Sequence, residues 1–185
     1  SGGDGTHTGI CQRPGCGAQD APAPCSGGDA TYFLQAVCRV CGGAYGPLKA
    51  DATPPSGEIV LGENRWNQFL NDVTFGLFFN KTQTVTVTAS DDSSAVGGYT
   101  PEKAPTAEYY VHSGGTALTL EQLKSLAFTR YTRPFSVDPQ ARLVVYAKIT
   151  DHAGNVTYIN SEGLVLDATA PALTGVENGA SYYVT

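Results

Sequence analysis

The sequence predicts an all-β protein in which a small cysteine-rich segment precedes a β-sandwich with one short helix. Three observations lead to this fold class. All five cysteines lie within the first 41 of the 185 residues. Beyond residue 57, apolar and polar residues alternate with a period of two, which is the pattern of strands that bury one face. Short runs of this kind recur between turn-forming residues, as expected for two packed sheets.

Residues 1–50 make up the cysteine-rich segment, which holds little apolar material apart from Tyr32–Val37. A segment of this size buries too little surface to fold alone, so it needs a cross-link, a metal or a neighbouring domain. Residues 42–57, with Gly, Pro and Ser spread through them, are predicted to be a linker. We therefore divide the chain into the cysteine-rich segment, a sandwich (51–169) and the start of a following module (170–185).

The strands of the sandwich are predicted from alternating side chains. Two runs alternate strictly and are rich in β-branched residues, Gln83–Ser90 and Arg142–Thr150. Their inward positions are Val85, Val87 and Ala89 in the first run, and Leu143, Val145, Ala147 and Ile149 in the second. The further candidate strands are Glu58–Leu61, Thr74–Phe79, Ala107–His112 and Asn155–Ile159.

One short helix and one hairpin turn complete the predicted sandwich. The helix is expected at Thr119–Leu126, where Thr119 caps it and Gln122 follows three residues later, as in a capping box. Its buried stripe would consist of Leu120, Leu123 and Leu126. The turn Asp151–Asn155 stands between two alternating strands and contains a glycine for a positive φ.

About seven short strands in roughly 110 residues fit a sandwich of the immunoglobulin-like type. The intersheet disulfide of antibody domains is excluded, because residues 51–169 contain no cysteine. The clustered aromatic residues of this part are expected in the core: Trp66, Phe69, Phe75, Phe78 and Phe79.

Several stretches resemble a known family. The pair Trp66 and Phe69, the run Phe75–Asp91, and the turn Asp151–Asn155 followed by a strand and Asp167–Pro171 resemble immunoglobulin-like repeats of large surface proteins of Gram-positive gut anaerobes. The resemblance implies modules strung in tandem outside the cell as stalks, spacers or adhesive units. The phrase Asp51–Pro55 is nearly repeated at Asp167–Pro171, 116 positions later, which suggests one module length and a chain cut from a longer array.

The cysteines allow two interpretations. Cys38 and Cys41 form a C-x-x-C-G turn, and with Cys11 and Cys16 they give a C-x4-C-x21-C-x2-C pattern typical of a zinc-ribbon-like structural site. Cys25 and His7 are alternate ligands. Disulfides are the other interpretation, because an extracellular protein meets oxidising conditions, but an odd cysteine count leaves one thiol over and favours zinc. Cys25–Gly46 also resembles short cysteine-containing segments of the same surface proteins, with Tyr32 where those have a cysteine.

No catalytic motif is present, so we expect that the chain is not an enzyme and that any catalytic domain lies outside it. His7, His112 and His152 have no accompanying partner motif. A net charge of −6 without basic clusters argues against nucleic acid as a partner. The longest apolar runs, such as Phe75–Phe79, are too short for membrane insertion.

Calcium is a second metal to consider. The loop aspartates Asp91, Asp92 and Asp151 could bind it together with Asp51 or Asp167 near the module junctions. No loop has the dense D-x-D-x-D spacing, so turn and cap roles are favoured over calcium.

The expected function is that of an extracellular spacer and adhesion unit, at the cell surface or secreted. Its partners would be neighbouring modules of the same chain and a host glycan or glycoprotein, immunoglobulin included. Tyrosine hydroxyls expected at the surface would supply the contact, at Tyr109, Tyr110 and Tyr146, with Tyr131 beside them. The alternative is an accessory, non-catalytic region of a secreted glycosidase or peptidase.

Overall fold

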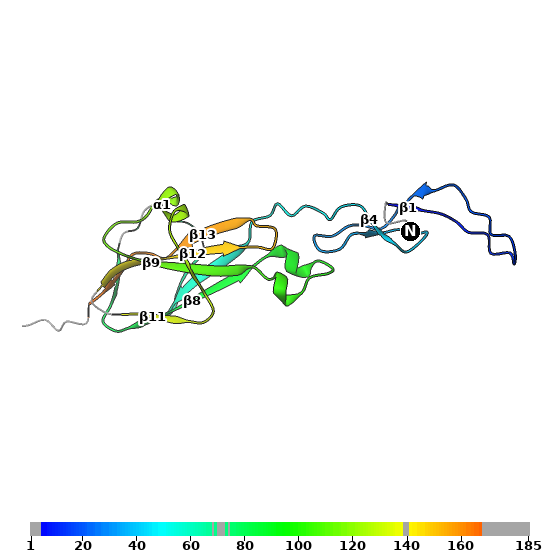
Figure 1. Cartoon of the computed structure of the whole chain (residues 1–185). Coiled ribbons are helices and arrows are strands. Elements are labelled where there is room, and N and C mark those ends of the chain that lie inside the picture. Colours follow the sequence, from blue (N-terminus) through cyan, green and yellow to red (C-terminus); the bar gives the residue numbers. More distant parts are fainter. Residues whose placement is uncertain (1–4, 68, 70–72, 74, 139–140, 168–185) are drawn as a thin grey trace, which may run out of the picture.

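The computed structural model describes residues 5–67, 69, 73, 75–138 and 141–167. The structure is mostly β and elongated, with the cysteine-rich segment extending from one end of a larger two-sheet domain (Figure 1). The predicted following module at 170–185 lies outside the described residues.

The cysteine-rich segment consists of two small antiparallel hairpins. In the first, β1 (Thr6–His7) pairs with β2 (Ala23–Pro24). In the second, β3 (Ala36–Val37) pairs with β4 (Ala44–Tyr45). Strands of two residues supply few ladder hydrogen bonds, so other contacts must hold this segment together.

The two-sheet domain contains one four-stranded antiparallel sheet with the order β11-β8-β5-β6. Its strands are β5 (Ser56–Leu61), β6 (Asn64–Trp66), β8 (Gln83–Ser90) and β11 (Phe135–Val137). The predicted run at 83–90 is confirmed with the same bounds, and the run at 58–61 begins two residues earlier than predicted.

The second sheet is six-stranded and is built around the long strand β12. The order is β10-β9-β12-β14-β7, and β13 also pairs with β12, beside β14. Only β14 and β7 pair in parallel among the described strands. The strands are β7 (Leu77–Phe79), β9 (Thr106–Ser113), β10 (Thr129–Arg130), β12 (Ala141–Thr150), β13 (Val156–Asn160) and β14 (Leu164–Leu166).

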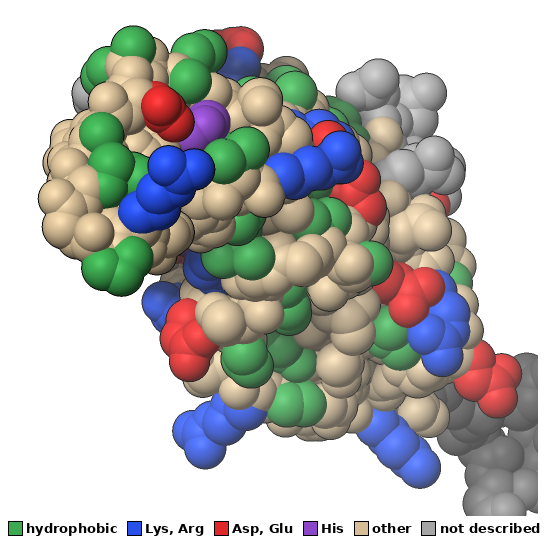
Figure 2. Space-filling model, turned by 90° about the vertical axis from the view of Figure 1, so that its right-hand side faces the viewer, with side chains coloured by type: hydrophobic (Ala, Val, Ile, Leu, Met, Phe, Trp, Pro, Cys, Tyr) green, Lys and Arg blue, Asp and Glu red, His purple; other side chains and the backbone are tan. Residues whose placement is uncertain are grey.

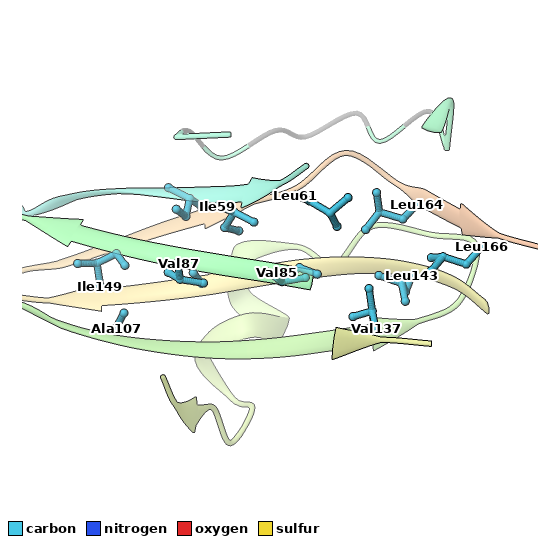
Figure 3. Close-up of a cluster of buried hydrophobic side chains, with 13 residues drawn as sticks. Ile59, Leu61, Val85, Val87, Ala107, Val137, Leu143, Ile149, Leu164 and Leu166 are labelled. Carbon is cyan, nitrogen blue, oxygen red and sulfur yellow. The ribbon is translucent and has the colours of Figure 1, made fainter. Parts of the chain in front are cut away.

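The core lies between the two sheets (Figure 3). The inward positions predicted for β8 and β12 are confirmed, and Val85, Val145 and Ile149 are fully buried there. Strand β14 adds Leu164 and Leu166 to the same cluster. Each sheet therefore turns toward this core the face that the period of two in the sequence predicts.

A second, smaller cluster covers the outer face of the six-stranded sheet. Val144 and Tyr146 of β12 point to this face, where Phe75 and Leu123 pack against them. The expected surface position of Tyr146 is wrong, because the loop before the helix covers it: its ring is fully buried and its hydroxyl accepts a hydrogen bond from the Leu118 N–H at 2.7 Å. Burial raises the pKa of this phenol.

The predicted helix is α1 (Leu120–Lys124), and its capping box is confirmed. The Gln122 N–H donates to Thr119 Oγ1 at 3.3 Å, and the Thr119 N–H donates to Gln122 Oε1 at 2.8 Å. The predicted stripe is wrong at Leu120, which is 38% exposed. Two 3-10 helices, η1 (Asp92–Ala95) and η2 (Pro101–Lys103), lie near the cysteine-rich segment (Figure 1). All described helices are far too short to traverse a bilayer.

The predicted aromatic core is confirmed in part. Phe75 is buried, and Trp66 and Phe79 pack against the cluster between the sheets. Phe69 packs against the second cluster. Phe78 is 73% exposed, because successive side chains of β7 alternate between the two faces and Phe79 occupies the inner one.

Candidate metal centre

Four side chains of the cysteine-rich segment converge on one point. His7, Cys25, Cys38 and Cys41 each offer a ligand atom, and these atoms lie within 4.8 Å of one another. The group contains both predicted alternates, His7 and Cys25, and two of the four ligands of the predicted pattern, Cys38 and Cys41.

The first hairpin positions His7 and Cys25. Antiparallel pairing of β1 with β2 places His7 opposite Ala23, two residues before Cys25. The Cys25 N–H donates to the Gly5 carbonyl at 2.7 Å, which extends the pairing by one step beyond the strands. His7 and Cys25, which are 18 positions apart in sequence, are thereby held side by side.

The second hairpin positions Cys38 and Cys41 in a tight turn. Cys38 follows β3 directly, its N–H donates to the Gly43 carbonyl at 2.8 Å, and its carbonyl accepts from the Gly42 N–H at 2.9 Å. Gly42 has a φ of +69°, which glycine adopts without strain. The Gly43 N–H also points to Cys41 Sγ at 3.4 Å. The C-x-x-C-G sequence thus forms the turn that its glycine predicts.

Hydrogen bonds to backbone carbonyls join the two hairpins. The Arg39 N–H donates to the Ser26 carbonyl at 3.1 Å, and the Tyr45 hydroxyl donates to the Gly27 carbonyl at 2.8 Å. Gly28 lies against Val37 so closely that an added Cβ would stand 2.6 Å from the Val37 carbonyl oxygen. The two glycines after Cys25 therefore allow the turn carrying Cys25 to approach the turn carrying Cys38.

The separations fit a tetrahedral metal site. Cys25 Sγ lies 3.8 Å from Cys41 Sγ, and Cys38 Sγ lies 3.7 Å from His7 Nδ1. In a tetrahedral zinc site with Zn–S of about 2.3 Å and Zn–N of about 2.0 Å, the corresponding separations are about 3.8 Å and about 3.5 Å. A disulfide needs sulfurs about 2.05 Å apart. All five cysteines are free thiols in this structure.

Hydrogen bonds and burial act in opposite directions on two of these thiols. The backbone N–H of Cys41, supported by those of Ser26 and Val40, lowers the pKa of the Cys38 thiol to about 6. Burial raises the pKa of the Cys25 thiol to about 12, and the neighbouring Cys38 and Cys41 sulfurs add to the rise. A cation between the sulfurs would favour the thiolate at every position, so metal binding would release the Cys25 proton.

The segment has almost no apolar core apart from this group. Within residues 5–50 the only buried side chains are those of Cys25, Ala36 and Cys38. Large apolar residues are exposed instead, with Val40 at 70%. A bound metal would supply the cross-link that a segment of this size requires.

Cys11 and Cys16 lie elsewhere in the segment. They belong to the long connection between β1 and β2, where the Cys11 N–H donates to the Ala18 carbonyl at 2.9 Å. The Cys11 side chain hydrogen-bonds to Cys16 and lowers the pKa of the Cys16 thiol. Three clustered cysteines and one separate pair account for the odd total that spacing alone did not explain.

The other predicted contact residues are placed as follows. Tyr109 and Tyr110 are half-buried on β9, and the Tyr109 ring stacks on Phe135 with centroids 4.0 Å apart. Tyr110 packs against the second apolar cluster. Tyr131 is also half-buried, 6.5 Å from the Tyr109 ring. Their role in binding a partner stays a prediction.

Comparison with known protein families, curated proteins and solved structures gave no match to this chain.

Proposed function

We propose that this chain is a non-enzymatic extracellular module of a multidomain bacterial surface protein and acts as a spacer and adhesion unit. In it, an immunoglobulin-like sandwich carries a zinc-stabilised cap. The carrying observation is that the linker meets the two-sheet domain at one end, whereas the last described strand finishes at the other end.

The length of strand β12 gives the distance between these two ends of the domain. At its Thr150 end, the neighbouring β13 residue Thr157 donates a hydrogen bond from its hydroxyl to the Pro55 carbonyl in the linker. At the other end, Ala141 pairs with Leu166, the last residue of β14. The ten residues of β12 span about 30 Å at roughly 3.3 Å per residue. Entry and exit at opposite ends is the arrangement that tandem spacers need.

The junction between the cysteine-rich segment and the two-sheet domain also favours a stiff spacer. The Thr31 hydroxyl donates to the Gly97 carbonyl at 2.9 Å. The Phe33 ring lies 6.1 Å from that of Tyr99 and 5.6 Å from that of His152. The segment is therefore held to the domain by side-chain contacts as well as by the linker.

The strand order supports the immunoglobulin-like sandwich. In such folds strand B lies between A and E in one sheet, and strand F lies between C and G in the other. Here β8 lies between β5 and β11, and β12 lies between β9 and the pair β13 and β14. The strands in these positions also follow one another along the chain in the same order as in the immunoglobulin fold. A sandwich with a different Greek-key connection would have a different chain order.

The proposed cofactor is structural zinc, held by His7, Cys25, Cys38 and Cys41. Three sulfurs and one imidazole form a donor set that zinc prefers, and four protein ligands leave no open position for catalysis. Metal analysis of the purified chain tests this assignment. We expect one zinc per chain, and less than about 0.3 zinc would contradict the tight binding expected of such a site.

The adhesive partner is proposed to be a host glycan or glycoprotein, immunoglobulin included, on the basis of the family resemblance. The surface charge does not favour a phosphate backbone. Figure 2, viewed from the end with the cysteine-rich segment, shows acidic and basic side chains dispersed among each other and no broad basic patch.

Measurements on the 185-residue chain test each part of the proposed function. A compact protein of this length has a radius of gyration of about 16 Å, so small-angle scattering should give a clearly larger value for a rigid spacer. A value near 16 Å would contradict the spacer. Glycan arrays and immunoglobulin pull-downs should identify the partner. Absence of binding in both assays would remove the adhesive role. Hydrolysis of a glycan or peptide by the purified chain would overturn the non-enzymatic assignment.

A further inference from the structure

We propose that Asp51, Asp91 and Asp92 form a calcium-binding site that fastens the linker to the two-sheet domain. One carboxylate oxygen from each residue lies within 4.8 Å of the others. The inference goes beyond the spacer function, because a spacer needs no second metal.

Strand pairing brings the three aspartates together. Ser56, the first residue of β5, pairs with Ser90, the last residue of β8. Asp51 precedes β5 in the linker, and Asp91 and Asp92 follow β8 directly. Residues 40 positions apart in sequence are therefore brought to the same end of the four-stranded sheet.

Asp91 gives the observation that points to a ligand. Its residue is only 7% exposed, and its Oδ1 accepts a hydrogen bond from the Ser93 N–H at 2.8 Å. Its other oxygen, Oδ2, is buried and has no hydrogen-bond partner among the described residues. A buried carboxylate oxygen without a partner costs free energy, unless a cation compensates it.

The surrounding charges strengthen the need for a cation. The three ion pairs found in the described part of the chain are Arg65 with Glu58, Lys124 with Glu121 and Lys148 with Glu108, and none involves these aspartates. Three carboxylates within 4.8 Å repel one another when all are ionised. A divalent cation between them would convert this repulsion into attraction.

The donor set selects calcium. All three donors are carboxylate oxygens, which hard cations prefer, whereas the sulfur and imidazole donors of the chain are gathered in the separate zinc group. Calcium takes six to eight oxygen ligands in flexible geometry, so carboxylates from a linker and a loop can share it with water. Magnesium demands a near-ideal octahedron and gives up its own waters reluctantly, so it is expected to bind this group more weakly.

Calcium would stiffen the junction. Asp51 belongs to the linker, whereas Asp91 is held rigidly as the N-cap of η1, so one ion bridging them restrains the linker. Extracellular calcium modules have dissociation constants of about 0.1 to 1 mM. The site would then be filled outside a cell and empty at the low calcium level of a cytoplasm.

The first test is calorimetric titration of the zinc-loaded 185-residue chain with CaCl2 in chelator-resin-treated buffer. We expect one calcium per chain with a dissociation constant of about 0.1 to 1 mM, and weaker binding of MgCl2. Asp51→Asn and Asp92→Asn should each lower the affinity for calcium at least tenfold. Asp138→Asn, an exposed aspartate that follows β11, should bind as the wild type does.

Both single-site variants leave the η1 cap at Asp91 intact, so they test binding without disturbing it. Absence of saturable calcium binding at concentrations up to 10 times the expected dissociation constants would overturn the site. A calcium affinity that is unchanged in both variants would overturn it as well. Magnesium binding as tightly as calcium would overturn its selectivity. An elongated scattering profile with no calcium binding would leave the spacer function intact and remove only this inference.

The stiffening is tested by endoproteinase Lys-C, which cleaves after Lys49 in the exposed linker. Calcium should slow cleavage at this bond at least threefold in the wild type and leave the rate unchanged in Asp51→Asn. An equal rate with and without calcium in the wild type would refute the bridging of the linker.

Discussion

The cysteine-rich segment and the two-sheet domain lie end to end but are stabilised by different physics. The two-sheet domain buries a cluster of 13 apolar residues between its sheets. Residues 5–50 bury three side chains, two of which are the candidate ligands Cys25 and Cys38. The stability of the two-sheet domain is therefore set by buried apolar area, whereas that of residues 5–50 would be set by the proposed zinc cross-link.

This difference has a thermodynamic consequence. Burial of apolar area is a property of the chain alone, but stabilisation by a bound metal grows with the concentration of that metal. One region should therefore respond to chelators and the other should not. The junction contacts of Phe33 and Asn155 determine whether the two responses stay separate.

The largest effect is expected from Cys38→Ser, which removes the most buried candidate ligand, 1% exposed. The variant should lose zinc and leave residues 5–50 unfolded, because metal-binding free energies of about 10 kcal/mol are folding free energies in such segments. The thermal transition of the two-sheet domain should persist. Zinc content and amide hydrogen exchange, read separately for the two regions, provide the measurement.

Cys16→Ser is the matched control for this variant. Cys16 is exposed and lies outside the group of four, so its loss should leave both zinc content and exchange unchanged. Equal loss of zinc in the two variants would instead support the Cys11, Cys16, Cys38 and Cys41 set that the spacing predicts.

The second prediction perturbs only the two-sheet domain. Leu164→Ala empties a fully buried position in the cluster between the sheets and should cost about 2 to 5 kcal/mol of unfolding free energy. Urea unfolding followed by the fluorescence of Trp66, the single tryptophan, measures this cost, because Trp66 packs against the same cluster.

Zinc retention distinguishes independent regions from a single cooperative unit. The Leu164→Ala protein should keep its zinc at urea concentrations that unfold the two-sheet domain. Leu48→Ala, at a position 48% exposed, should change the unfolding free energy by less than about 0.5 kcal/mol. Loss of zinc in step with the Trp66 signal would show that the regions unfold together.

Local patterns in the sequence predicted those elements whose structure is determined locally. The alternation in β8 and β12 identified their buried faces, because each strand has a face on the same core. The capping residues Thr119 and Gln122 located α1 to within a residue of its start. The turn at Asp151–Asn155 is confirmed, with the Asp151 N–H donating to the Asn155 carbonyl at 3.1 Å and Gly154 at a φ of +93°.

Local patterns could not predict the features that depend on contacts between residues far apart in the sequence. The metal group depends on which residues the β1–β2 pairing places together, so spacing alone favoured Cys11 and Cys16 over His7 and Cys25. The two glycines after Cys25 were the available signal, because they mark a second tight turn. Tyr146 was misplaced because its strand is buried on both faces, which alternation of polarity does not reveal.

The smallest effect is expected from Asn155→Ala, which acts on the connection between the two regions. The Asn155 amide donates to the carbonyls of Asp51 and Thr53 at 3.2 and 3.3 Å, and to Asp151 Oδ2 at 2.8 Å. Its loss should lower the unfolding free energy of the two-sheet domain by about 1 kcal/mol. It should also speed Lys-C cleavage after Lys49, because the linker loses its attachment.

Asn64→Ala is the control for this third prediction, since the Asn64 amide donates to the Leu61 carbonyl at 3.4 Å within the β5–β6 turn, away from the linker. It removes the same chemical group but should leave the Lys49 cleavage rate unchanged. If Asn155→Ala and Asn64→Ala are cleaved at the same rate, the linker is held by Thr157 and Phe33 without help from the turn. If only Asn155→Ala is cleaved faster while zinc content stays constant, the turn joins two regions that remain separately stable.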